Sequence, residues 1–192
     1  METREAIWSR RSVRAYLDRP VPDAALEQVL EAGLYAPSAV NFQPWYFVAV
    51  RSRDELAALT EIMGTVSARI EPDLQARFAK HPEVVAETTR FIRLLGGAPV
   101  CVLAFQQKPD YPKTAGTIIQ SVAAAIENIL LAATDMGLGS CWLTAPVEAE
   151  MGAVLGARYA PGKGPLTAMI TLGYPAQAAK APARKDGRYV IL

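Results

Sequence analysis

The most constraining feature of this sequence is a long apolar segment in its second half. From Ile118 to Ala133 the residues are apolar at all but a few positions, which predicts one helix over residues 114–136. Apolar residues cover most of the circumference of such a helix, so it must be buried on several sides. The polar interruptions favour burial inside protein over a span across lipid; they are Gln120, Ser121, Glu127 and Asn128.

The other periodic segments predict helices and strands that could cover this helix. Two prolines, Pro72 and Pro82, predict broken helical pieces and a mobile lid between residues 64 and 93. Gly137 and Gly139 predict a helix C-cap followed by a strand whose backbone can approach a ligand closely. We expect helices over residues 3–9, 22–35, 52–63 and 146–155, and strands over residues 45–50, 98–105, 138–144 and 166–172.

Composition and charge narrow the class of protein. The 192 residues are 51% hydrophobic and 20% charged, which is typical of one globular domain over residues 1–192. A net charge of +1 gives no global basic field for binding nucleic acid. The charged start is followed by no apolar signal core. Cys101 and Cys141 lie in apolar surroundings without a CxxC pattern, so we expect buried free thiols in a cytoplasmic protein.

Classical catalytic and nucleotide-binding motifs are missing from the sequence. Its only histidine, His81, has no second histidine or cysteine near it, so we expect a surface residue and no metal site. A single imidazole in this position makes Ser–His or Cys–His hydrolysis a weak hypothesis. No GxGxxG or Walker pattern occurs, so neither a dinucleotide-binding Rossmann site nor a P-loop is predicted.

A basic segment near the N-terminus is the first candidate binding motif. Residues 10–14 read Arg-Arg-Ser-Val-Arg, with three guanidiniums and a hydroxyl in five positions. Arginine binds phosphate oxygens through paired, planar donors, and serine adds another. A solvated charged surface explains the residues equally well. A nucleic-acid-binding arm does not fit the balanced overall charge.

The second candidate is the loop over residues 36–45, between a predicted helix and a predicted strand. Pro37 and Pro44 keep it extended. Ser38, Asn41 and Gln43 bring polar groups that could contact the edge of a flat heterocycle with alternating N–H and C=O groups. Asn and Ser are also common in plain capped turns, and by itself the loop fits that alternative better.

Taken together, four motifs make the chain resemble the nitroreductase family of flavin mononucleotide (FMN) oxidoreductases. The resemblance covers nearly the whole chain and weakens over residues 64–93. It implies an α+β fold with a mostly antiparallel central sheet flanked by helices, in an intertwined homodimer with two shared FMN sites. The motifs are residues 10–14, 37–45, 137–142 (Gly-Leu-Gly-Ser-Cys-Trp) and 172–175 (Leu-Gly-Tyr-Pro).

The resemblance also assigns residues to the flavin site. Residues of the basic segment and Arg184 correspond to positions at the phosphate and ribityl chain, and residues 142–144 to a segment along the flavin ring. The second basic residue that is common two positions before Arg184 is Pro182 here, and Lys185 could substitute for it. The residues implied are Arg10, Arg11, Ser12, Arg14, Trp142, Leu143, Thr144 and Arg184 from one chain, and Pro37, Ser38, Ala39, Asn41 and Gln43 from the other.

The function implied is ping-pong hydride transfer from NADH or NADPH, through FMN, to an electron-poor acceptor such as a nitroaromatic or a quinone. Because a flavin carries this chemistry itself, no catalytic histidine, carboxylate pair or metal is required. Two alternatives stay open. One is a specialised flavin enzyme of the same family, such as a dehalogenase or a metabolite dehydrogenase; the other is a flavin-binding sensor without turnover.

Overall fold

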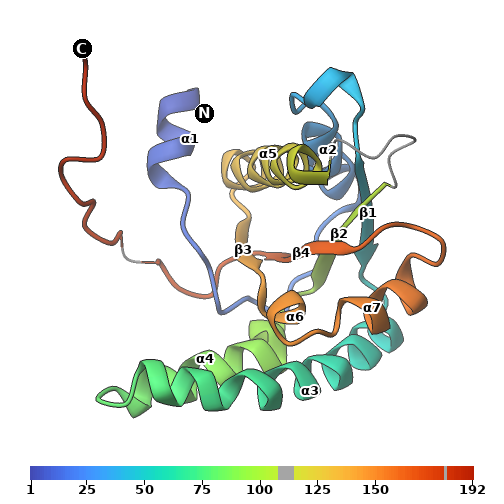
Figure 1. The fold of residues 1–192 in the computed structure, drawn as a ribbon, viewed down its shortest axis with the longest axis vertical. Helices are drawn as coiled ribbons and strands as arrows, with labels where there is room; N and C mark the ends of the chain where they lie inside the picture. Colours follow the sequence, from blue (N-terminus) through green and yellow to red (C-terminus); the bar gives the residue numbers. More distant parts are fainter. Residues whose placement is uncertain (108–114, 180) are drawn as a thin grey trace.

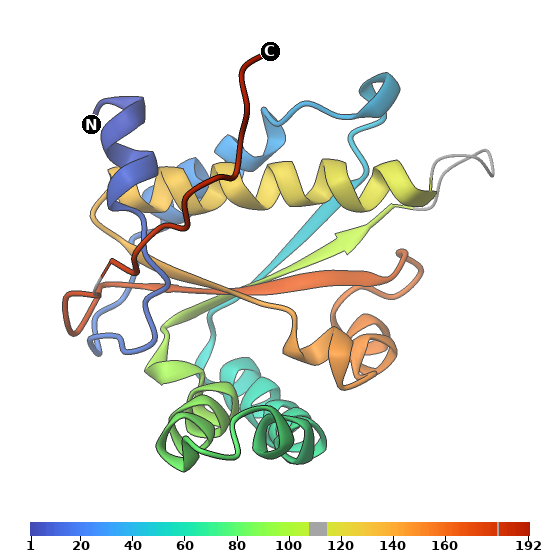
Figure 2. The same ribbon diagram turned by 60° about the vertical axis from the view of Figure 1, so that its left-hand side comes forward.

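The computed structural model describes residues 1–107, 115–179 and 181–192, and the fold has three layers (Figures 1 and 2). An antiparallel sheet forms the middle layer. Helices α2 and α5 cover one face with α1 beside α5, and α3, α4, α6 and α7 lie on the other face. The strands are β1 (Trp45–Val50), β2 (Val100–Gln106), β3 (Gly139–Leu143) and β4 (Leu166–Gly173).

The helices follow the expected order along the chain. Two short 3₁₀ turns, η1 (Ala39–Asn41) and η2 (Leu95–Gly97), precede β1 and β2. The α-helices are α1 (Thr3–Ser9), α2 (Asp23–Leu34), α3 (Arg53–Arg77), α4 (Pro82–Leu94), α5 (Ala115–Asp135), α6 (Ala145–Glu148) and α7 (Gly152–Tyr159). The predicted α+β class with helices flanking an antiparallel sheet is confirmed.

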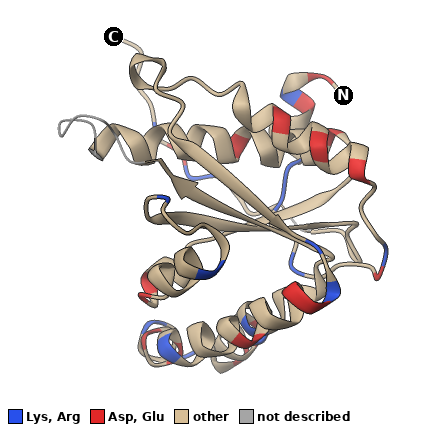
Figure 3. Cartoon of the chain, turned by 90° about the vertical axis from the view of Figure 1, so that its right-hand side faces the viewer, with Lys and Arg blue, Asp and Glu red and all other residues tan. Residues whose placement is uncertain are grey.

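The order of the sheet is β1-β2-β4-β3, so β2 and β4 are its central strands. None of the strands contains a Lys, Arg, Asp or Glu, and Figure 3 shows these residues on the helices and connecting segments. The continuous apolar run of β2 has both faces buried, as predicted for a central strand. An uncharged sheet of this kind requires a layer of helices on each face.

Helix α5 forms the core of one of these layers. Val122, Ala125, Ile126 and Ile129 are fully buried, in one cluster with Val102 and other sheet residues. By length and composition α5 is the one helix among the described residues that could cross a membrane, yet this cluster shows the packing of a core helix. The buried helix expected from the sequence is confirmed, except that residue 114 lies outside the described residues.

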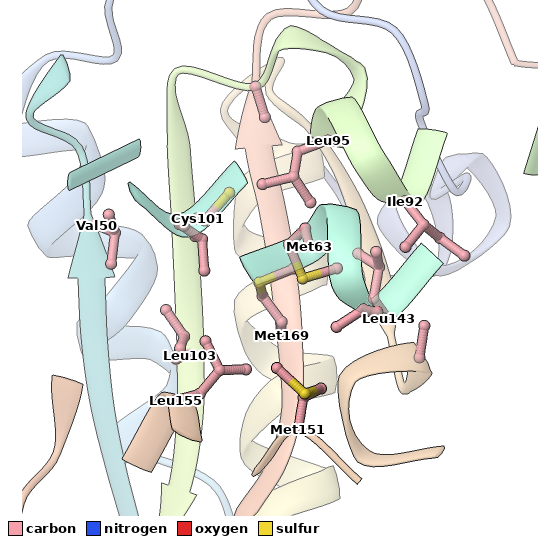
Figure 4. Close-up of a cluster of buried hydrophobic side chains, with 14 of the residues drawn as sticks. Val50, Met63, Ile92, Leu95, Cys101, Leu103, Leu143, Met151, Leu155 and Met169 are labelled. Atoms are coloured by element: carbon pink, nitrogen blue, oxygen red, sulfur yellow. The ribbon is translucent and has the colours of Figure 1, made fainter. Parts of the chain in front are cut away.

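A second cluster fills the space between the sheet and the helices of the other layer. Met63 of α3, Met169 of β4 and Met151, which precedes α7, come together there (Figure 4). Cys101 and Cys141 are buried free thiols, as expected. Burial raises the pKa of the Cys101 thiol to about 12. His81 is exposed, as predicted for a surface residue.

The prediction that Pro72 breaks the chain is wrong, because α3 continues through it to Arg77. Pro72 and Ala68, whose carbonyl would accept its missing N–H, are both exposed, so water can solvate that carbonyl. The opposite side of α3 packs against α4, and Val66 and Ile70 bury apolar surface there. Pro82 does interrupt the chain, and it starts α4 at a position where proline is favoured.

Two other predictions need correction. The single helix expected over residues 146–155 is divided into α6 and α7, because Glu150 between them has a positive φ of 56°. Gly137 is the expected C-cap of α5, with a φ of 72°. The space beside Gly139, however, is occupied by the chain itself and not left for a ligand: a Cβ added to Gly139 would lie 2.8 Å from the Val13 side chain. The sequence between the predicted strand over residues 98–105 and the predicted helix over residues 114–136 indicates a loop over residues 108–113, which lies outside the described residues.

Candidate active site

The basic segment, residues 10–14, lies against the β3 edge of the sheet. The Val13 N–H donates to the Ser140 carbonyl over 2.9 Å, and residues 12 and 140 form a parallel β-bridge. Because Gly139 has no Cβ, the Val13 side chain can lie directly on β3. The segment is therefore attached to β3 by its backbone.

Residues 14–17 continue this attachment. The Tyr16 N–H donates to the Gly96 carbonyl over 3.1 Å, and a Cβ on Gly96 would lie 2.3 Å from the Arg14 carbonyl oxygen. Gly96 also has a φ of 63°, so only glycine fits this contact well. The Leu17 N–H donates to the Tyr174 carbonyl. Arg14 is thus held between β3 and the η2 turn.

Tyr16 is the side chain that secures the segment. It is buried, and its hydroxyl lies 2.7 Å from both the Val13 carbonyl and the Thr171 hydroxyl of β4. Burial is the main cause of the raised pKa of Tyr16, so the ring stays neutral. A buried, neutral tyrosine with a satisfied hydroxyl fixes the backbone between Val13 and the sheet.

The polar side chains of the basic segment take up different arrangements. Arg10 forms an ion pair with Glu127 of α5, with 3.3 Å between Nε and Oε1. Arg11 folds back and donates to the Trp8 and Arg10 carbonyls at the end of α1. The exposed Arg14 lies with its guanidinium 5.8 Å from the centre of the Phe91 ring. Arg10 and Arg14 are therefore the more available cations.

Three of these residues affect the pKa of the Cys141 thiol in β3. Burial raises its pKa, while Arg14, the Ser12 hydroxyl and Arg10, in that order, lower it in part. Arg10 contacts Glu127 of α5 and Arg14 lies near Phe91 of α4, so the two guanidiniums reach different layers of helices. We refer to Arg10, Ser12 and Arg14, the three residues that affect Cys141, as the positive site beside β3.

The β3 residues predicted for the flavin ring lie next to this site. Trp142 is half-buried and Leu143 buried within β3, and the exposed Thr144 follows, donating to the Glu148 carboxylate. Ser140 lies beside Ser12, and its hydroxyl is the one fully buried side-chain oxygen or nitrogen among the described residues without a hydrogen bond. An unsatisfied buried hydroxyl is unfavourable, which makes Ser140 a candidate polar group for a ligand.

The loop over residues 37–43 is exposed and strained. Val40, Asn41 and Gln43 have φ values of 48°, 55° and 50°, a region that costs non-glycine residues about 1–3 kcal/mol each. Ser38 stabilises the turn by accepting from the Gln43 N–H, and the Gln43 amide donates to Asn41 Oδ1. The Ala39 N–H donates to Ser121 of α5. The turn is capped, as its composition allows, and it also presents two amides to the surface.

One chain does not bring this loop and the basic segment together. The loop leads into Trp45, which pairs with Gln106 on the β1 side of the sheet. The basic segment pairs with Ser140, which lies opposite Leu172 at the β3 edge, and Leu172 pairs with Val100. These places differ by three strand spacings, roughly 14 Å, and by six residues along β2, roughly 20 Å. They are diagonal corners of the sheet.

Arg184 lies in the segment over residues 181–192, all of which are exposed. Lys185 is exposed in the same segment. The structure therefore brings together residues 10–14 and 142–144 of one chain, and leaves the loop over residues 37–43 apart from them.

Comparison with known proteins agrees with this fold. The sequence model of the Nitroreductase family matches residues 7–174. The chain belongs to this family.

Among the similar proteins is an NADH dehydrogenase of Thermus thermophilus, 31% identical over 200 residues that cover 100% of this chain and 96% of the relative. Iodotyrosine deiodinase 1 of Rattus norvegicus is 27% identical over 94% of this chain and 65% of its own length. A solved nitroreductase with bound FMN from Bacteroides fragilis has a TM-score of 0.74 and 30% identity, covering 100% of this chain and 99% of that one.

Several residues that shape this site are not part of the motifs in the sequence. Phe91 of α4 lies in the region where the resemblance weakens, Gly96 lies in the η2 turn that follows, and no sequence pattern marks either residue. Glu127 did have a signal, since it is a charged residue inside a strongly apolar helix. Tyr16 is two positions beyond the basic segment, and its partner Thr171 is far away in the chain.

We expect Tyr16→Phe to lower the free energy of unfolding by about 1–3 kcal/mol, because it leaves the buried Thr171 hydroxyl and the Val13 carbonyl without their shared partner. Urea denaturation followed by circular dichroism measures the change. Tyr35→Phe is the matched control, since Tyr35 is 80% exposed. Loss of its hydroxyl should change the free energy of unfolding by no more than about 0.5 kcal/mol. Equal stability of the two variants would contradict the anchoring role.

Proposed function

We propose that this protein is an FMN-dependent oxidoreductase that transfers hydride from NADH or NADPH to an electron-poor acceptor. The observation that carries the proposal is the positive site of Arg10, Ser12 and Arg14, in a segment whose backbone is bonded to β3 beside Trp142 and Leu143. Membership of the Nitroreductase family supports it, and so does the FMN in the Bacteroides fragilis structure.

The donors present fit a flavin monophosphate. Two guanidiniums and a hydroxyl within five residues match the charge and the oxygens of one phosphate group. The unsatisfied Ser140 hydroxyl, adjacent to Ser12, is a further group of the kind that a ribityl chain could pair with. The sequence has no dinucleotide fingerprint for an adenylate half, so FMN fits better than FAD.

In this proposal the chain's residues bind and orient. Arg10, Ser12, Arg14 and, from the exposed C-terminal segment, Arg184 would hold the phosphate and the ribityl chain, and Arg11 would contribute through its backbone. Trp142, Leu143 and Thr144 would lie along the ring. When bound, FMN would supply the redox chemistry by taking hydride from a nicotinamide and giving it to an acceptor in a second, separate half-reaction. Cationic groups near the ring would stabilise the negative charge gained on reduction.

The acceptor is proposed at the level of chemical class. Nitroaromatics and quinones are electron-poor aromatic molecules, which suits hydride transfer from a reduced flavin. The similarity to a rat iodotyrosine deiodinase favours halogenated aromatics as a second class of acceptor. A flavin-binding sensor would share the site without turnover, so the two half-reactions distinguish it from an enzyme.

The proposal predicts a purified protein that carries FMN. Mass spectrometry of the released flavin should show FMN and not FAD. Under anaerobic conditions NADH or NADPH should bleach the flavin absorbance, and a quinone or nitroaromatic added afterwards should restore it. Retention of FMN without reduction by either nicotinamide would support the sensor, and FAD as the main flavin would contradict the proposed cofactor.

Arg14→Ala should weaken FMN binding about 10- to 100-fold, because a charge-assisted hydrogen bond to phosphate contributes roughly 1.5–3 kcal/mol. Fluorescence titration of the apoprotein with FMN measures the dissociation constant. Arg77→Ala is the control, since Arg77 is an exposed arginine at the far end of α3, next to the Phe78 ring. An unchanged affinity in Arg14→Ala would exclude Arg14 from the phosphate site.

We also propose that two chains form a homodimer whose flavin sites each use both. Pro37, Ser38, Ala39, Asn41 and Gln43 of one chain would then complete the site formed by residues 10–14 of the other. The diagonal separation of these segments within one chain supports this arrangement. So does the exposed apolar surface that a partner could cover, which includes Trp8, Ile119, Tyr189, Val190, Ile191 and Leu192.

Complementation tests the shared site. Arg14→Ala and Asn41→Ala chains should each lose FMN affinity, and refolding an equal mixture should restore one intact site in every mixed dimer. Random pairing makes about half of the dimers mixed, so roughly a quarter of wild-type sites should return.

The matched control mixes Arg14→Ala with Arg10→Ala chains. Both changes lie in the same segment, so no mixed dimer contains an intact site and no recovery is expected. Recovery in the control, or none in the first mixture despite mixed dimers in native mass spectrometry, would contradict the shared site.

A further inference from the structure

Helix α5 carries two charged residues between Gly116 and Asp135, and both are carboxylates paired with the N-terminal segment. Asp135 contacts the α-amino group of Met1 over 2.6 Å, and Glu127 contacts Arg10 over 3.3 Å. Both carboxylates are nearly half exposed, so each ion pair lies on the accessible side of the helix. Of these two carboxylates, only Glu127 contacts a residue of the positive site.

The geometry of the Arg10–Glu127 pair leaves the guanidinium available. Glu127 meets Arg10 on its Nε side, and among the described residues the Arg10 side chain makes no other ion pair and no other hydrogen bond. The two terminal nitrogens therefore stay free for phosphate oxygens, which bind the planar donors of arginine in pairs. A carboxylate that accepts from Nε in this way fixes the direction in which the two terminal nitrogens of the guanidinium point.

Arg10 has a particular need for such support. Its backbone N–H closes α1 by donating to Ala6, but the hydrogen bonds that fix the segment to the sheet begin only at Val13. Its side chain has many rotamers, and ordering it costs binding free energy. The Arg11 guanidinium is oriented by the backbone carbonyls to which it donates. Arg10 has no such backbone acceptor in the described part of the chain, so its orientation depends on the side chain on α5.

We propose that Glu127 is a positioning residue that sets FMN affinity by holding the Arg10 guanidinium toward the phosphate. The inference rests on the proposed FMN site, and it concerns the phosphate end alone. Because the pair is partly exposed, with a quarter of the Arg10 side chain and nearly half of the Glu127 side chain accessible, its contribution is modest.

The experiment compares FMN with riboflavin, which has the same ring and ribityl chain but no phosphate. Glu127→Ala should raise the dissociation constant for FMN about 3- to 10-fold and leave that for riboflavin within about twofold. Glu127→Gln should restore FMN affinity to within about twofold of wild type, since its amide oxygen can still accept from Nε. Asp135→Ala is the matched control on the same helix and should leave both affinities unchanged.

A double-mutant cycle tests whether the effect acts through Arg10. In an Arg10→Ala background, Glu127→Ala should have no further effect on FMN affinity. Equal losses for FMN and riboflavin would indicate a merely structural role and overturn the proposal. Tighter FMN binding in Glu127→Ala would show that the carboxylate competes with phosphate, which also overturns it. If wild type fails to bind FMN at all, the proposed function itself fails, whereas normal binding without these differences rejects only the role of Glu127.

Discussion

The backbone attachment of residues 12–17 to the sheet is the interaction on which the candidate site depends. Val13 and Tyr16 join the segment to β3 and to the η2 turn, and the Tyr16 hydroxyl joins it to β4. The contacts are close because Gly139 and Gly96 lack a Cβ. Without them, three basic or polar side chains would belong to a solvated arm; with them, the backbone of the segment is fixed beside β3.

The two layers of helices make that attachment possible. The uncharged sheet is covered by α5 on one face and by the α3–α4 pair on the other, and each layer also meets the basic segment. From α5 comes Glu127, which contacts Arg10; from α4 comes Phe91, which lies near Arg14. Elements that build the core therefore also orient the polar side chains at its edge.

The loop over residues 37–43 shows the opposite situation, in which strain is kept at the surface. Three non-glycine residues have positive φ values there, and a hydroxyl and two amides hold the turn together. Such strain persists where the surroundings impose it and often marks binding sites. The loop and the basic segment occupy diagonal corners of the sheet, which is why we propose that each contributes to a site completed by a two-fold partner.

The sequence by itself determined the helices and strands, because hydrophobic periodicity reports burial directly. The apolar run of β2 and the all-round apolar surface of α5 are such patterns. The motifs at residues 10–14 and 37–45 are likewise local and can be found from the sequence. It did not determine the path of α3 through Pro72 or the break at Glu150, because these depend on packing and solvation of particular carbonyls. Nor did it pair Tyr16 with Thr171 or Arg10 with Glu127. Those contacts join residues more than a hundred positions apart, and only tertiary structure brings such residues within hydrogen-bonding or ion-pair distance.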